Sequence, residues 1–357
     1  MDEKKRSIIC ASKQASKQAS KQASKRIDWI DFGKGFTIFL VVFGHVVLGL
    51  YESKHFLASN NWLWFLVQAT YIFHIPVFFA LSGYFFKPLN SFKDYGIYVL
   101  NKTLQLGVPY IFYNIIQYVL QSLGGNTVRN PARLVDLFTI YRAPLGVSWF
   151  LYVLWGIFLF LGFLSIRIKA KKQLFGISLL TLFLVSFFPN DLMLIQRVGL
   201  WSSVFLFGNL LRDVSFKKVG IWLSNLSVMI LGYLGIWYQF DFENRISYYL
   251  PKAWGIIYFI SVLFAFIMFA NFPFKRMYHY FLKYGESSLV IYILHAPIVS
   301  VTRIILLKLG ITDVLLHIIS GLLAGWFGSL LAIYLLNKIP YVDFIFYPAK
   351  YIRFSKK

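Results

Sequence analysis

The sequence predicts an all-α bundle of about ten transmembrane helices with both termini in the cytosol. Of its 357 residues, 58% are hydrophobic and only 14% are charged, which gives more apolar surface than a soluble domain could cover. Apolar stretches recur along the chain, and basic residues gather on alternate connections between them. With the N-terminus inside, 27 Lys/Arg lie on the inner side, 8 lie outside and Arg303 lies within a span, as the positive-inside rule requires. We expect spans over 35–51, 62–86, 104–123, 147–166, 173–189, 194–211, 219–239, 253–272, 287–306 and 314–336.

Three regions follow from this pattern. Residues 1–34 form a basic cytosolic tail, in which the tetrapeptide Ala-Ser-Lys-Gln begins at Ala11 and repeats. The repeat has no apolar face, so we expect a tail near anionic lipid, with a lipid-specific or regulatory role as the alternative. Residues 35–336 form the transmembrane domain, and 337–357 form a basic cytosolic segment. No apolar stretch precedes Cys10, so we expect no cleavable signal peptide.

The net charge of +22 suggests nucleic-acid binding at first sight. The basic residues, however, lie mostly between apolar segments, where membrane topology requires them, so no nucleic-acid partner is expected. Cys10 is the only cysteine, and the six histidines include no HExxH motif. We therefore expect neither a disulfide nor a metal site.

The first span carries the strongest candidate chemistry. His45 follows Lys34 by eleven positions, with ten residues between them, which is a rotation only about 20° beyond three helical turns and a rise of about 16 Å along the axis. Lys34 would lie at the cytosolic edge and His45 near mid-membrane, with Asp31 close to the same face. A neutral imidazole at that depth suits a general base. The alternatives are a snorkelling lysine and a histidine that bonds to a neighbouring helix.

Further polar residues occur in the later spans. His74 precedes Pro76 in the second span and is either a second catalytic group or a packing residue. Asn114, Gln117 and Gln121 in the third span together indicate a polar cavity rather than lipid contact. The fourth span opens with Ser148 and Trp149, and Trp149 alone would suit an interfacial anchor.

Two roles are possible for the polar pair in the ninth span, and two for the longest outward loop. Ser288 precedes His295 by seven residues and shares its helical face. The pair either lines a cavity or forms hydrogen bonds between helices. Loop 124–146 either contacts an external acceptor or is a solvated connector.

These segments resemble the acyltransferase-3 family of integral membrane acyltransferases, in particular its fucose 4-O-acetylase-like branch. The resemblance rests on five motifs in order along the chain. They are Ile27-Asp28-Trp29-Ile30-Asp31-Phe32-Gly33-Lys34-Gly35 leading to Phe43-Gly44-His45, the run from Phe73-His74-Ile75-Pro76 to Gly83-Tyr84-Phe85-Phe86-Lys87, Pro109-Tyr110, Trp149-Phe150-Leu151 and Gly285-Glu286-Ser287-Ser288-Leu289.

The resemblance implies an O-acetyltransferase of the plasma membrane that uses acetyl-CoA and a hydroxyl of a surface or lipid-linked polysaccharide. His45 matches the family's essential histidine and Lys34 its basic partner. Many members carry Arg-x-x-Arg after the second helix, where this chain has lysines, so Lys87 and Lys102 become candidates for CoA binding. Candidate substrate contacts are Asp31, Asn114, Ser148, Trp149, Glu286 and His295.

Membrane lipids and the glycan are the expected partners, and a homo-oligomer is compatible with the sequence. The alternative function is a transporter of a glycan or lipid-linked sugar, although no internal repeat of the transporter kind is evident. Acyl-CoA turnover would separate the two functions.

Overall fold

The computed structural model describes residues 27–124, 131–216 and 255–355, with isolated positions 220, 222, 223, 226 and 230. Within this part the chain is helical and has no strand, so the predicted all-α class is confirmed. In chain order the helices are α2 (Asp28–Ser53), α3 (Asn60–Gly83), α4 (Phe92–Gly124), α5 (Leu134–Phe138), α6 (Trp149–Arg167), α7 (Lys171–Phe187), α8 (Met193–Leu210), α10 (Ile256–Ala270), α11 (Lys275–Tyr284), α12 (Ser288–Lys308) and α13 (Val314–Leu336), with 3₁₀ turns η1 (Leu57–Ser59), η3 (Gly146–Ser148), η4 (Leu211–Asp213), η7 (Val342–Ile345) and η8 (Pro348–Lys350).

Six of the described helices are long and apolar enough to cross a membrane, and seven if α10 and α11, which meet at a bend of 113°, form one span. The predicted span 219–239 lies outside the fully described ranges. The predicted spans 104–123 and 173–189 fall on α4 and α7, which are not among the six. Helix α7 has only 17 residues, and α4 carries several amides. A count of about ten spans and cytosolic termini therefore remain predictions.

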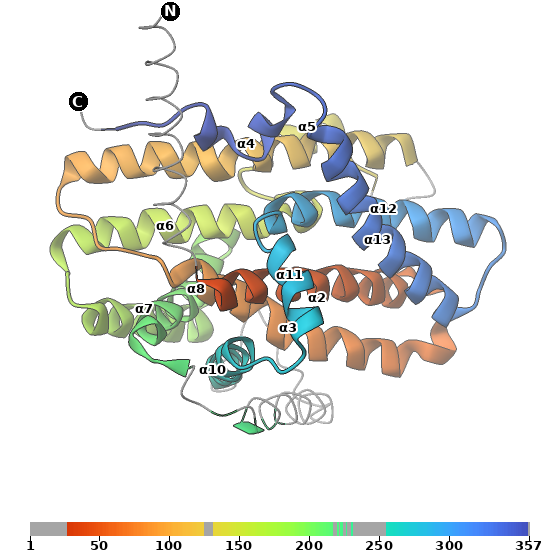
Figure 1. Ribbon diagram of the computed structural model, residues 1–357. Coiled ribbons are helices and arrows are strands. Elements are labelled where there is room, and N and C mark those ends of the chain that lie inside the picture. Colours follow the sequence, from red (N-terminus) through yellow and green to blue (C-terminus); the bar gives the residue numbers. More distant parts are fainter. Residues whose placement is uncertain are drawn as a thin grey trace, which may run out of the picture.

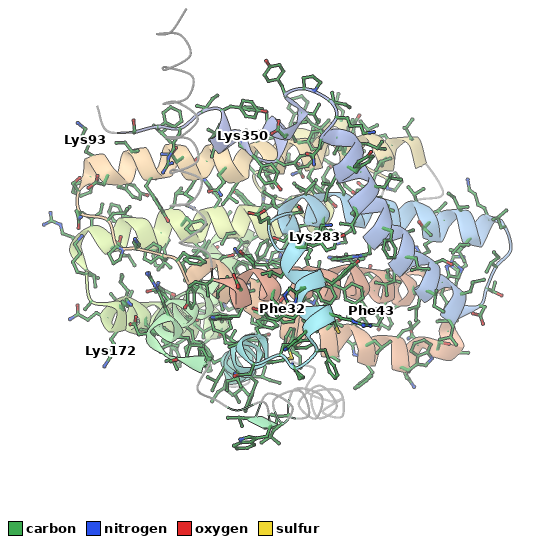
Figure 2. The ribbon with its side chains drawn as sticks, viewed as in Figure 1. Phe32, Phe43, Lys93, Lys172, Lys283 and Lys350 are labelled. Atoms are coloured by element: carbon green, nitrogen blue, oxygen red, sulfur yellow. The ribbon has the colours of Figure 1, made fainter. Side chains whose placement is uncertain are left out.

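Most long helices run along a common direction, and α11 crosses α2 steeply (Figure 1). Lys93 and Lys172, both assigned to the inner side by sequence, lie at the same end of the bundle (Figure 2). Helix α13 keeps large apolar side chains exposed at spacings of four residues, a pattern that suits contact with lipid. These side chains are Leu315, Ile319, Leu323, Phe327 and Leu331.

Helix α2 begins at Asp28, earlier than the predicted start of the first span. Asp28 and Asp31 occupy its first turn, where carboxylates interact favourably with the helix dipole. Lys34 therefore lies on the same continuous helix as His45. The helix fixes the position of the Lys34 backbone relative to that of His45.

Phe32, which Figure 2 labels, belongs to an aromatic cluster that joins this first part of α2 to α10 and α11. The Phe32 ring stacks on Tyr278, with centroids 4.7 Å apart and an angle of 19° between the planes. It also meets Phe269 and Phe272 at 5.7 and 4.8 Å. Aromatic pairs of this kind contribute about 0.5–1.5 kcal/mol beyond their buried area, so the cluster stabilises the end of α2 that carries Lys34.

Helices α3 and α8 approach so closely that glycine is required on both. A Cβ added at Gly208 would collide with the backbone carbonyl of Ala80, and one at Gly83 would collide with that of Phe205. The Asn209 amide donates to the carbonyls of Gly83, Tyr84 and Phe86 at 3.2, 3.3 and 2.8 Å. This amide satisfies acceptors that the end of α3 leaves open.

Gly208→Ala is therefore expected to destabilise the bundle by about 1–3 kcal/mol, because overpacking forces the two backbones apart. Gly176→Ala on α7 is the matched control, since a Cβ there meets no described atom within 4 Å. The control should be neutral or gain up to about 1 kcal/mol from helix propensity. Thermal denaturation of the detergent-purified variants measures the difference. Equal midpoints for Gly208→Ala and wild type would contradict the predicted collision.

Candidate active site

A cavity of about 770 Å³ lies among α2, α3, α4, α6, α8 and α12. On α2 its wall extends from Lys34 through His45 and Gly49 to Glu52. Glu52 follows Lys34 by eighteen positions on the helix, a rise of about 27 Å. Because a hydrocarbon core is about 30 Å thick, the cavity extends over most of the depth of a membrane.

A second cavity, of about 620 Å³, adjoins the Lys34 end of the first, and both are lined by Lys34 and Ser288. The Lys34 ammonium lies 3.3 Å from the Asp31 carboxylate. Glu286 and Tyr347 also line this second cavity, and burial raises the pKa of the Tyr347 phenol. Lys34 thus stands where the two cavities meet.

His45 belongs to a compact group of rings around the first cavity. Its Nδ1 lies 3.4 Å from the Tyr71 hydroxyl, and its ring centroid lies 5.1 Å from that of His295. The Tyr71 ring in turn contacts His74 at 4.6 Å. His45, Tyr71 and His74 all line the cavity, so the two histidines predicted to be catalytic are joined through a tyrosine.

His295 is fully buried behind this wall. Its Nδ1 lies 2.9 Å from the Ile291 carbonyl, and because a carbonyl only accepts, Nδ1 carries the proton. Nε2 is then an acceptor, and no hydrogen bond reaches it from the described residues. His295 therefore lies beside His45 but not on the wall of the first cavity, so a direct substrate contact by His295 gains no support from its position. Among the described residues no three potential ligands group to hold a metal ion.

Asn114 and Ser148 hold a loop in place. The Asn114 side-chain oxygen accepts from the Leu145 backbone N–H at 2.8 Å and from the Ser148 hydroxyl at 3.3 Å. The Asn114 amide nitrogen donates to the Tyr110 carbonyl at 2.7 Å. Both side chains are fully buried, and neither belongs to the cavity wall, whereas Gly146 and Val147 of the same loop do. Substrate contact by Asn114 or Ser148 therefore gains no support from this arrangement.

Comparison with known proteins identifies the family of the chain. The acyltransferase domain described for acyltransferase-3 proteins matches residues 27–337. This chain belongs to the acyltransferase-3 family. The match begins just before α2 and ends just after α13, so every helix around the two cavities lies inside it.

Curated relatives agree with this assignment. The chain is 29% identical over 140 residues to nodulation protein NolL of Mesorhizobium japonicum, a stretch that is 39% of this chain and 34% of the relative. It is 31% identical over 131 residues to NolL of Sinorhizobium fredii, 36% of this chain and 34% of the relative. The match thus spans about a third of the length of each relative. No solved structure matches the chain.

Of the remaining residues predicted to bind substrate or CoA in this acyltransferase-3 protein, some line a cavity and others lie outside both cavities. Asp31 and Glu286 line the second cavity and Trp149 the first. Lys87 is exposed and lies on neither cavity wall. Lys102 donates to the Gln105 side chain at 3.2 Å and lies 4.0 Å above the Phe158 ring. Lys102 does not line the first cavity itself, but its partner Gln105 does.

Several cavity residues were missed by the sequence analysis. Tyr71 contacts both His45 and His74. Because Tyr71 lies about one helical turn before His74, helical periodicity could have indicated that both side chains share one face of the helix. Arg197 lines the first cavity with its guanidinium 4.3 Å from the Trp149 ring centroid, and Arg303 lines it as well. Charged side chains inside apolar spans are functional candidates by default, so this rule could have found both arginines.

Proposed function

We propose that this acyltransferase-3 protein is a multi-pass plasma-membrane O-acyltransferase. Its donor would be acetyl-CoA on the cytosolic side, and its acceptor would be a hydroxyl of a surface or lipid-linked polysaccharide. The supporting observation is the cavity that runs from Lys34 to Glu52 with His45 on its wall between them. Such a passage lets a donor and an acceptor enter from opposite ends and meet at one imidazole.

The donor end is assigned to the second cavity and Lys34. An ammonium has three N–H donors, of which one faces Asp31, so the others can reach a phosphate or the thioester carbonyl. Charge-assisted hydrogen bonds of this kind are strong. The carboxylates of Asp31 and Glu286 in the same cavity restrict the anion to the Lys34 side. The narrow pantetheine arm would then extend along the first cavity towards His45.

The transfer step follows from the position of His45. The acceptor hydroxyl oxygen attacks the acyl carbon while His45 removes the hydroxyl proton. The carbon–sulfur bond breaks, an ester forms, and the proton passes to the departing CoA thiolate. When the Tyr71 oxygen accepts from His45 Nδ1–H, the lone pair of Nε2 is available as the base. A covalent acyl-His45 intermediate is the alternative route to the same ester.

Two measurements test the proposal. The first compares ester-linked acetate on the surface polysaccharide of wild-type and deletion cells, and we expect it to fall in the deletion strain. The second follows CoA release from acetyl-CoA by the purified protein with and without acceptor. A protein that moves glycan across vesicles without consuming the thioester would be a transporter, and the acyltransferase proposal would then be wrong. The comparisons give the transporter no support.

A further inference from the structure

The end of the first cavity opposite Lys34 has its own set of side chains. Glu52 comes from α2, Trp64 and Gln68 come from α3, and Arg303 comes from α12. All four are half-buried. Three helices therefore present an indole, an amide, a carboxylate and a guanidinium to one end of the same passage.

Local packing builds this end. A Cβ added at Gly49 would collide with Nη1 of Arg303, so the glycine makes the room in which the guanidinium lies against α2. Trp64 packs on Tyr51 with ring centroids 4.8 Å apart and planes 32° apart. The guanidinium and the indole are thus placed by neighbours from α2 rather than left to rotate in solvent.

The chemistry of this end selects its ligand. An aromatic face offers apolar contact to the C–H face of a ring, while Gln68 both donates and accepts. Glu52 accepts from hydroxyls and Arg303 donates to them. Glu52 and Arg303 carry one charge of each sign, so together they add no net charge that would select an anionic or a cationic ring.

We propose that this end of the cavity, lined by Glu52, Trp64, Gln68 and Arg303, is the acceptor subsite and binds a neutral sugar ring. The inference rests on the proposed acyltransferase function and adds the residues and charge class of the acceptor. Gly49 and Glu52 follow His45 by four and seven residues, about 6 and 10 Å along the helix axis. A ring bound there presents a hydroxyl of the same or the next sugar to the His45 imidazole.

Trp64→Ala and Arg303→Gln test the subsite in full-length protein in native membranes. Trp62→Ala and Lys308→Gln are the matched controls, because each lies on the same helix as its partner variant, is exposed and lies outside both cavities. We expect each subsite variant to raise the acceptor KM about tenfold or more, the loss of roughly one buried hydrogen bond or aromatic contact. The rise in the acceptor KM should exceed any rise in the acetyl-CoA KM, whereas a general loss of structure would affect both. The controls should match wild type in both KM values.

A second arm tests the charge class of the ring. Acetyl-CoA consumption by wild-type membranes is measured with three added probes: a neutral cello-oligosaccharide, an anionic oligogalacturonate and a cationic glucosamine oligomer. We expect the neutral probe to increase consumption most and Trp64→Ala to remove that increase. Greater stimulation by a charged probe, or none by any of the three, would overturn the neutral-ring assignment.

The two proposals fail in different ways. If wild type transfers acetate to its acceptor and both subsite variants keep the wild-type acceptor KM, the subsite assignment is wrong and the acyltransferase proposal stands. If wild type consumes no acyl-CoA under any condition, the acyltransferase proposal is wrong, and the subsite assignment falls with it.

Discussion

His45→Ala is expected to lower acetyl transfer by about 10²–10⁴-fold, the usual contribution of a positioned general base, or to abolish it. The substitution removes a polar ring from the membrane interior and adds a good helix former, so insertion and expression should stay near normal. Acetate on the acceptor glycan, measured at matched protein levels, gives the result.

Two controls isolate the imidazole. His279→Ala removes a histidine that is exposed on α11 and lies on neither cavity wall, and it should leave transfer unchanged. Labelled acetyl-CoA given without acceptor distinguishes the chemical routes, because only the covalent route leaves label on the protein. Wild-type acetylation in the His45→Ala strain would sink both the general-base and the acyl-histidine routes.

Lys34→Ala is expected to raise the KM for acetyl-CoA by about 10- to 100-fold with a smaller change in kcat. A hydrogen bond to a charged group is worth about 1.5–3 kcal/mol, and each 1.4 kcal/mol is a factor of ten. Lys34→Arg should retain part of the function because the charge remains at the same depth. Steady-state kinetics with varied donor at saturating acceptor measures the effect.

Lys87→Ala is the matched control for Lys34. Both are basic residues expected near the inner side of the membrane, but Lys87 lies outside both cavities, so its removal should leave the donor KM unchanged. An equal rise in KM for Lys34→Ala and Lys87→Ala would mean that general surface charge, rather than the junction of the cavities, attracts the donor.

The sequence alone predicted the relation between Lys34 and His45 because it depends only on helix periodicity. Both residues lie on one continuous helix and line one cavity. The contact of His45 with His295 joins residues 250 positions apart, so no periodicity within one helix can indicate it. The role of Asn114 was equally out of reach, because a membrane amide that lines a cavity and one that holds a buried loop have the same local sequence pattern.

The bend between α10 and α11 was missed for a different reason. The stretch after α10 carries Lys275, Arg276 and Lys283, so its composition indicated a connecting loop. In the structure α11 is an amphipathic helix that buries Phe281 and meets Phe36 and Phe39 of α2 through that ring. Charge patterning indicated a connection between spans but could not show that one face of this segment packs.

The C-terminal segment affects how the protein should be handled at the bench. Asn101 and Phe354 exchange two hydrogen bonds, at 2.9 and 3.0 Å, which tie the end of the chain to α4. Tyr347, upstream of that tie, lines the second cavity, whereas the family match stops at residue 337. A protein truncated at the family boundary would lack part of the wall of the second cavity, which is the proposed entrance for the donor. A purification tag fused directly after Phe354 would also disturb the hydrogen bonds between Phe354 and Asn101 that hold this segment in place. Handles for isolation or imaging are therefore better joined to the N-terminal side, ahead of residue 27.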